Sequence, residues 1–177
     1  AMISKKMTDR NNLQINREMF SAYLYMAMSA RMAEAGYKGI ANWLMIQYHE
    51  EMFHAMKLYG YLEDQGAAVA LEAIAKPEFK ETAVKELFRH VLEHEKGVTA
   101  SIREIAALAR EEKDYATESF IAWYVGEQVE EEKNAADILQ AIDLLGDSAQ
   151  GNFMLNIELG KRKLGVPSDF TAMGGGD

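Results

Sequence analysis

The sequence predicts an all-α protein built as a four-helix bundle with a short fifth helix. Its 177 residues contain only two prolines, Pro77 and Pro167, so roughly 75 residues on each side of Pro77 lack helix breakers. Four long segments repeat apolar residues at the three-four spacing of an amphipathic helix. The length suits one sizeable core and is too short for two ordinary domains, so we expect a single domain over residues 1–177.

Glycines mark where several helices end. Gly36, Gly66 and Gly146 follow the first, second and fourth periodic segments, at positions typical of helix C-termini. The last residues, 166–177, are expected to form a flexible tail. The expected helices cover, in chain order, about residues 4–35, 39–64, 81–112, 114–145 and 148–164.

The connections between these helices predict the topology. The first two helices are joined by residues 36–38, and the third and fourth meet around Lys113, so each pair should form an antiparallel hairpin. The linker over residues 66–80 can span about 50 Å when extended, whereas a helix of about 26 residues is about 39 Å long. This long crossover can therefore run the length of the bundle and place the third helix parallel to the second.

Composition excludes several classes of function. The chain has no cysteine, which excludes disulfides, thiolate catalysis and Cys-ligated zinc or iron–sulfur sites, and which fits a reducing, cytoplasmic location. A formal net charge of −9 disfavours nucleic acid as a partner and favours cations. No apolar run approaches the roughly 18 residues that a membrane-spanning helix needs, so we expect no membrane partner.

Each apolar stripe is interrupted near its middle by polar side chains. In the third helix, Val91 and Val98 lie on the stripe and Glu95 takes the slot between them. The corresponding interruptions elsewhere are Glu18 in the first helix, Glu51 and His54 in the second, and Glu127, Gln128 and Glu131 in the fourth.

The depth of these groups predicts a buried acidic layer. Glu18, Glu51, Glu95 and Glu131 lie within about one turn of the expected helix midpoints, so packing would bring all four to one level. Burying unpaired carboxylates together costs several kcal/mol for each group, and no lysine or arginine lies on these faces. The carboxyl groups are then either protonated or bound to cations. The presence of His54, whose imidazole is also a metal ligand, favours bound cations over protonation.

The spacing of Glu51 and His54 indicates a metal site. Residues at i and i+3 project to the same side of one helix turn, which gives one metal an oxygen and an imidazole ligand. Such mixed ligation suits iron or manganese, and zinc less selectively. The fourth helix lacks a second histidine: Glu130 stands three residues after Glu127, and the alternative pair is Gln128 with Glu131.

Four stretches carry a resemblance to a known family. They are residues 16–25 (NREMFSAYLY), 50–54 (EEMFH), 94–95 (HE) and 123–133 (WYVGEQVEEEK). Over about residues 4–165 the chain resembles bacterial and archaeal non-haem ferritins, members of the ferritin-like di-iron superfamily. The resemblance implies a ferroxidase that oxidises Fe²⁺ with O₂ or H₂O₂, and iron storage in a hollow shell of roughly 24 copies of the chain.

The resemblance also implies a pair of iron sites within one subunit. The first Fe²⁺ would be held by Glu18, Glu51 and His54. Glu51 would bridge to a second Fe²⁺, whose site Glu95 and Glu131 would complete. The resemblance thus assigns a catalytic role to these five ligands. It adds Tyr25, on the same face as Glu18, as a sixth catalytic residue that forms a hydrogen bond near the pair and donates an electron.

For the other residues to which the resemblance assigns a role, a purely structural role is the alternative. Gln128 would lie beside the second iron, either as a ligand or only as a hydrogen-bond partner, and Tyr25 would otherwise be a packed core aromatic. A third, weaker iron site would consist of Glu50, Glu127 and Glu130, which would otherwise form a solvated acidic patch.

Two related classes fit less well. Bacterioferritins bind haem through a methionine just after the bridging glutamate, where this chain has Met52, but they carry a second Glu-x-x-His, so we expect no haem. A di-iron peroxidase of the rubrerythrin type would use a cysteine-bound electron-transfer module, and this chain has no cysteine. This redox enzyme without mineral storage is the alternative function.

The first helix predicts a second contact surface. Apolar residues cover a face of it outside the core stripe, and a helix that is apolar on more than one side is buried on more than one side. We therefore expect self-association into a homo-oligomer. The residues of this second face are Met19, Phe20, Tyr23, Leu24, Met26 and Ala27.

Overall fold

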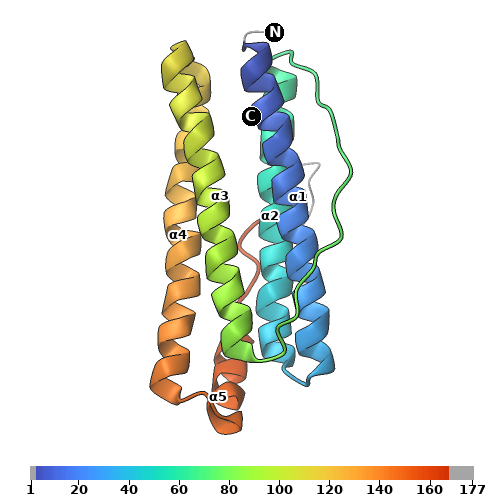
Figure 1. Cartoon of the computed structure of the whole chain (residues 1–177), viewed down its shortest axis with the longest axis vertical. Helices are drawn as coiled ribbons and strands as arrows, with labels where there is room; N and C mark the ends of the chain where they lie inside the picture. Colours follow the sequence, from blue (N-terminus) through green and yellow to red (C-terminus); the bar gives the residue numbers. More distant parts are fainter. Residues whose placement is uncertain (1–2, 168–177) are drawn as a thin grey trace.

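The computed structural model describes residues 3–167 and consists of four long α-helices with a short fifth helix across one end (Figure 1). α1 pairs with α2, and α3 with α4, as antiparallel hairpins, and no strand occurs in the described chain. The predicted four-helix bundle with a short fifth helix is confirmed. The helices are α1 (Lys5–Glu34), α2 (Lys38–Asp64), α3 (Val84–Glu112), α4 (Tyr115–Leu145) and α5 (Ala149–Leu159).

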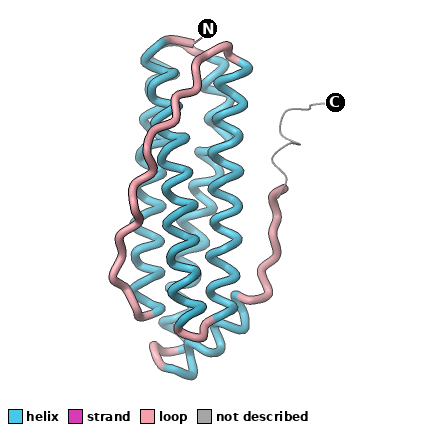
Figure 2. The backbone as a smooth tube through the Cα atoms, turned by 90° about the vertical axis from the view of Figure 1, so that its right-hand side faces the viewer, coloured by secondary structure: helices cyan, strands magenta, loops and turns pink. Residues whose placement is uncertain are grey.

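The crossover between α2 and α3 runs along the length of the bundle (Figure 2), which makes α2 and α3 parallel as predicted. An extended segment cannot satisfy its own backbone hydrogen bonds, and asparagines of α1 supply partners for it. The Asn12 side-chain amide donates to the Ala68 carbonyl at 2.9 Å, and its oxygen accepts from the Ala70 N–H at 2.8 Å. One turn later, Asn16 donates to the Glu72 carbonyl at 3.3 Å.

Two helix boundaries differ from the expectation. α3 begins at Val84, later than expected, because the Glu81 carboxylate accepts a hydrogen bond from the preceding backbone N–H and holds this stretch outside the helix. α5 ends at Leu159, earlier than expected, because Gly160 closes the helix and the chain then turns so that Arg162 contacts α2. Most of the predicted tail, residues 168–177, lies outside the described residues.

The apolar core is divided into two clusters. Met28, Leu44 and Phe88 belong to the cluster near α5, and Met7 and Leu58 belong to the cluster at the opposite end. Full burial of one such side chain contributes about 1.5–3 kcal/mol, so both ends of the bundle are strongly apolar. The buried acidic and amide side chains lie between the clusters, at mid-height of the bundle. None of the described helices is long and apolar enough to cross a membrane.

The outer apolar face of α1 is narrower than its sequence predicts. Leu24 is fully inside the core, and Met19 and Phe20 pack against the core clusters. Tyr23 remains exposed on the outside. Part of the face that we expected to contact a second subunit is therefore used within the chain.

α5 is fixed to the start of α2 by a side chain that caps the longer helix. Tyr37, at the N-cap position of α2, makes no capping bond with its own side chain. Instead, the Asn156 side-chain oxygen accepts from the Gly39 N–H at 2.7 Å and from the Ile40 N–H at 3.1 Å. These are two of the four N–H groups that a helix N-terminus leaves unsatisfied. The close approach of α5 requires glycine at position 39, where a Cβ would lie 1.8 Å from the Asn156 carbonyl oxygen.

We expect Gly39→Ala to separate α5 from α2, because the added methyl group overlaps with backbone and the Asn156 cap is then lost. The cost should be about 2 kcal/mol, measured by thermal unfolding, together with faster amide exchange in α5. Gly60→Ala is the matched control in the same helix, where a Cβ meets no atom within 4 Å. It should be neutral or stabilising by up to about 1 kcal/mol. Equal stability of the two variants would contradict this account.

Candidate metal centre

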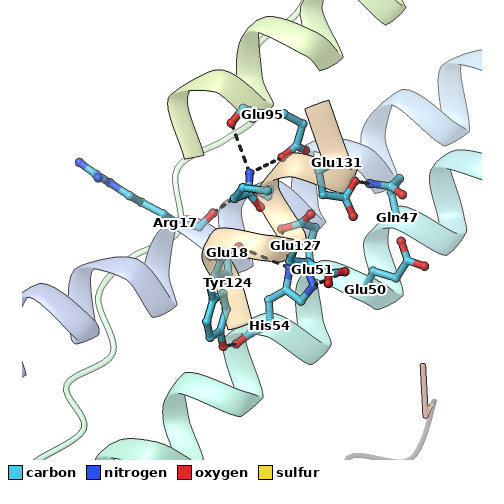
Figure 3. A network of polar contacts seen from close by, with 12 residues as sticks. Arg17, Glu18, Gln47, Glu50, Glu51, His54, Glu95, Tyr124, Glu127 and Glu131 are labelled. Atoms are coloured by element: carbon cyan, nitrogen blue, oxygen red, sulfur yellow. Dashed lines mark hydrogen bonds and ion pairs between the residues drawn. The ribbon is translucent and has the colours of Figure 1, made fainter. Parts of the chain in front are cut away.

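The polar layer between the two apolar clusters gathers side chains from all four long helices (Figure 3). The five acidic and imidazole side chains of this layer are each at most 3% exposed, far below the usual exposed fraction of a charged residue. These residues lie at one level, as predicted, because the four helices are similar in length. The crossover also returns the chain to the end of the bundle where α2 begins, so α3 starts at the same level as α2. The acidic and imidazole groups are Glu18 from α1, Glu51 and His54 from α2, Glu95 from α3 and Glu131 from α4.

The tightest group in this layer consists of Glu18, Glu51 and His54. One ligand atom from each lies within 4.8 Å of the others. His54 Nδ1 is 3.7 Å from Glu51 Oε2 and 3.9 Å from Glu18 Oε2. The i to i+3 spacing in α2 thus places the imidazole and the carboxylate on one side of the helix, and α1 supplies the second carboxylate.

Four buried polar atoms of this group have no hydrogen-bond partner among the described residues. They are Glu18 Oε2, both carboxylate oxygens of Glu51, and His54 Nε2. A buried polar atom without a partner costs about 1–3 kcal/mol, and a charged one costs more. No lysine or arginine of the described chain pairs with Glu18 or Glu51. A cation between the Glu18 and Glu51 carboxylates, on the Nδ1 side of His54, would satisfy the carboxylate oxygens, whereas Nε2 faces Glu127.

Glu95 and Glu131 complete the layer, and neutral donors hold them. The Tyr25 hydroxyl donates to Glu95 Oε1, and Gln128 Nε2 donates to Glu95 Oε2 at 3.1 Å. Gln47 Nε2 donates to Glu131 Oε2 at 2.9 Å. Because these donors are neutral, they orient the two carboxyl groups without adding a positive charge that would compete with a cation.

The residues predicted for a third iron site are less tightly gathered. Glu127 is half-buried, with Oε1 3.8 Å from His54 Nε2. Glu50 is paired with Arg162 at 2.6 Å, and Glu130 is exposed on α4. In the part of the chain that the structure describes, these three do not form a compact group of ligand atoms like that of the inner site.

Sequence reasoning missed several groups that support the centre. Gln14 donates to Glu18 Oε1 at 2.7 Å, and Gln47 donates to Glu131. Each glutamine stands four residues before a buried glutamate of its own helix. This spacing places the two side chains on one face of the helix and could have marked the glutamine as part of the polar layer. Ser101 donates to the Gln14 side-chain oxygen from α3, and no local sequence signal marks that contact.

Burial controls the protonation of the layer. It raises the pKa of Glu131 to about 8, with a further contribution from the Glu95 charge. Burial also raises the pKa of Glu51 and of Glu95, although His54 and the Tyr25 hydroxyl respectively oppose the effect. For His54, burial favours the neutral imidazole, but the nearby carboxylates of Glu127, Glu51 and Glu18 outweigh it and raise the pKa. The metal-free layer therefore holds protons that a metal would displace.

Fold and site together define a class of helical bundle with a carboxylate- and histidine-lined centre inside one subunit. A family model described as a ferritin-like domain matches residues 11–145. A bacterial non-heme ferritin of Staphylococcus aureus is 37% identical over 161 residues, covering 91% of this chain and 97% of the relative. A probable bacterial non-heme ferritin-like protein of Haemophilus influenzae is 38% identical over 159 residues, covering 90% and 96%.

The fold of this chain is also similar to that of solved ferritin structures. The crystal structure of an open pore ferritin from the archaeon Archaeoglobus fulgidus has a TM-score of 0.89 and 41% identity, covering 92% of this chain and 99% of the other. The chain belongs to the ferritin family, as a non-haem ferritin, which the motifs in its sequence predicted. It is thus a member of an iron-storage family, with a buried Glu, Glu and His group at mid-bundle.

We expect the metal-free protein to lose stability as the pH rises from about 5 to about 8. A carboxyl whose pKa is raised in the folded state stabilises the fold below its unfolded pKa, and this contribution is lost as the pH passes the folded value of about 8. Glu131→Gln should flatten this dependence and raise stability at about pH 8 by about 1–2 kcal/mol, or roughly 4 °C in Tm.

The measurement is thermal unfolding in the presence of a chelator at several pH values. Glu63→Gln, an exposed position on α2, is the control and should leave the pH dependence unchanged. A Glu131→Gln variant with the wild-type dependence would remove Glu131 from this explanation.

Proposed function

We propose that this protein is a ferroxidase and iron store, with Fe²⁺ as the substrate of the mid-bundle centre. The first Fe²⁺ binds Glu18, Glu51 and His54. The second binds Glu51, Glu95 and Glu131, so that Glu51 bridges the pair. Gln128 lies beside the second position as a hydrogen-bond partner of Glu95.

The observation that carries this proposal is the buried group of Glu18, Glu51 and His54, in which three carboxylate oxygens have no hydrogen-bond partner among the described residues. One ligand atom from each of the three residues lies within 4.8 Å of the others, and no lysine or arginine of the described chain pairs with either carboxylate. Carboxylate and imidazole ligands suit iron or manganese, and the family stores iron. Glu51 is the natural bridge because neither of its oxygens has a hydrogen-bond partner among the described residues.

The chemistry follows from placing two reducing ions side by side. Each Fe²⁺ gives up one electron, and the pair reduces one O₂, with two protons, to H₂O₂. H₂O₂ can in turn serve as the oxidant. In that step H₂O₂ takes two electrons and two protons to form two H₂O, with one electron from a further Fe²⁺ and the other from the Tyr25 phenol, whose proton leaves through its hydrogen bond to Glu95. Burial raises the pKa of Tyr25 well above its usual value, so the phenol is protonated before this step. Fe³⁺ then leaves past Glu50, Glu127 and Glu130 to the mineral.

We expect Glu51→Ala to abolish the fast phase of Fe²⁺ oxidation, because both ions lose a ligand. The loss should be at least about a hundredfold in rate, measured by stopped-flow absorbance after Fe²⁺ is mixed with oxygenated protein. Glu63→Ala, on the exposed side of the same helix, should retain the fast phase. An unchanged fast phase in the Glu51 variant would refute the bridging role.

Apolar side chains on the outside support self-association. Near the bundle end that carries α5, Leu144, Phe153, Met154 and Ile157 are all more than half exposed. Leaving four such side chains in water is costly, and a second copy of the chain offers the same apolar surface to cover them. We propose that these contacts help to close the shell of roughly 24 copies that the family resemblance implies.

Gel filtration of the purified protein, with and without iron, tests the storage role. We expect a particle of several hundred kilodaltons that takes up many Fe per subunit, because a shell of roughly 24 chains of 19.9 kDa is required to hold mineral. Leu144→Lys should shift the protein towards smaller species, whereas the exposed Tyr115→Lys at the opposite end of α4 should not. A dimer that oxidises Fe²⁺ but retains no mineral would favour the peroxidase-like alternative.

A further inference from the structure

The segment after α5 brings a cation to the acidic edge of the metal centre. Beyond Gly160 the chain turns back and runs beside the bundle (Figure 2), and it places Arg162 against α2. Arg162 Nη2 lies 2.6 Å from Glu50 Oε2. Glu50 immediately precedes the proposed bridging residue Glu51 in α2, so this guanidinium binds a carboxylate one residue away from the iron pair along the helix.

Arg162 is held by more than this one ion pair. Its guanidinium carbon lies 4.6 Å from the centre of the Trp43 ring, and Nη1 approaches the Trp43 carbonyl at 3.5 Å. The Asn42 amide donates to the Arg162 carbonyl at 3.2 Å. The Arg162 and Glu50 side chains are only 20% and 15% exposed, so water screens their attraction less than that of an ordinary surface pair.

This pair sets the direction of Glu50. In Figure 3 the Glu50 carboxylate points away from Glu51. Burial raises the pKa of Glu50, and the Arg162 charge, followed by that of His54, opposes the rise. The nearby Glu127 charge acts in the opposite sense. Glu50 thus lies within the electrostatic influence of the site while its carboxylate is bound to a side chain from the C-terminal segment.

We propose that Arg162 is a built-in competitor for the outer iron position: it holds Glu50 in the resting subunit, and Fe²⁺ must displace it to use Glu50 as a ligand. The outer iron position is the one that Glu50, Glu127 and Glu130 would form along the exit path of the proposed function. The inference rests on that function, because it assigns a regulator to this position. A guanidinium cannot lose its proton near neutral pH, so deprotonation of Arg162 cannot release Glu50 and a competing cation such as Fe²⁺ must do so.

Two consequences follow from this competition. Arg162 lowers the affinity of the outer position without contacting the ligands of the inner pair, so outer occupancy stays transient and Fe³⁺ can move on. By linkage, Fe²⁺ at the outer position must also weaken the docking of the segment over residues 160–167. The C-terminal segment is thereby coupled to iron loading.

The test compares Arg162→Gln with Lys161→Gln in the assembled protein. Lys161 is the neighbouring cation, and its Nζ contacts Glu158 at 2.6 Å on the surface of α5. Anaerobic calorimetry with Fe²⁺ gives the affinity of each position, and anomalous diffraction gives its occupancy. Arg162→Gln should tighten the outer position about tenfold and leave the inner pair unchanged. Lys161→Gln should change neither.

Further variants keep the test decisive. Adding Glu50→Gln to Arg162→Gln should remove the tenfold gain, because the freed carboxylate is what the metal would use. Should Arg162→Gln fail to assemble, Arg162→Lys keeps the charge but loses the planar fork, and it should tighten the outer position roughly threefold. Wild-type protein should also show faster amide exchange over residues 160–167 when Fe²⁺ is added, which a purely structural clamp would not.

The outcomes separate this inference from the proposed function. If the inner positions of the wild-type protein take up no Fe²⁺, the proposed function itself fails. If they fill, and Arg162→Gln leaves the outer affinity at the wild-type value or Lys161→Gln gives an equal gain, only the role of Arg162 is overturned.

Discussion

Acidic side chains buried between two apolar clusters impose the constraint on which this molecule depends. The clusters at either end drive the four helices together, and in doing so they remove Glu18, Glu51, Glu95 and Glu131 from water. Apolar burial on the order of a few kcal/mol per side chain is large enough to do this, whereas the acidic layer alone would drive the helices apart. The fold therefore creates an affinity for cations as a direct result of its own packing.

Neutral donors and unpartnered atoms divide the layer into two parts. At its edges, Gln14, Gln47, Gln128 and Tyr25 donate to carboxylate oxygens and fix their directions. At its centre, both oxygens of Glu51 are without a partner in the described chain. A lysine or arginine in place of any of these donors would neutralise the site and compete with the metal. Amide and phenol groups orient the ligands and leave the charge for Fe²⁺.

Most of the fold could be predicted from sequence because its signals are local. Helical periodicity, glycine stops and the length of the linker define the helices and their order, and the spacing of Glu51 and His54 defines one turn of α2. Contacts between distant segments could not be predicted. Asn156 caps α2 and Arg162 binds Glu50 across more than a hundred residues of sequence, and nothing near either residue marks its partner. The early end of α5 could not be predicted for the same reason, because it depends on the contact of Arg162 with α2.

The placement of positive charge gives a reason for iron to move outward after oxidation. The ligands of the proposed inner pair have only His54 as a potential cation among their described contacts, and His54 must lose its proton when a metal binds. Outside it, Glu50 is bound by Arg162, and Glu130 faces water. In the proposed mechanism, an Fe³⁺ ion leaving the pair would therefore meet carboxylates that hold it less strongly, since one must first release its own guanidinium and the other is solvated. Iron uptake at the centre and release toward the mineral both require such a difference in affinity, and in our proposal the Arg162–Glu50 pair contributes to it.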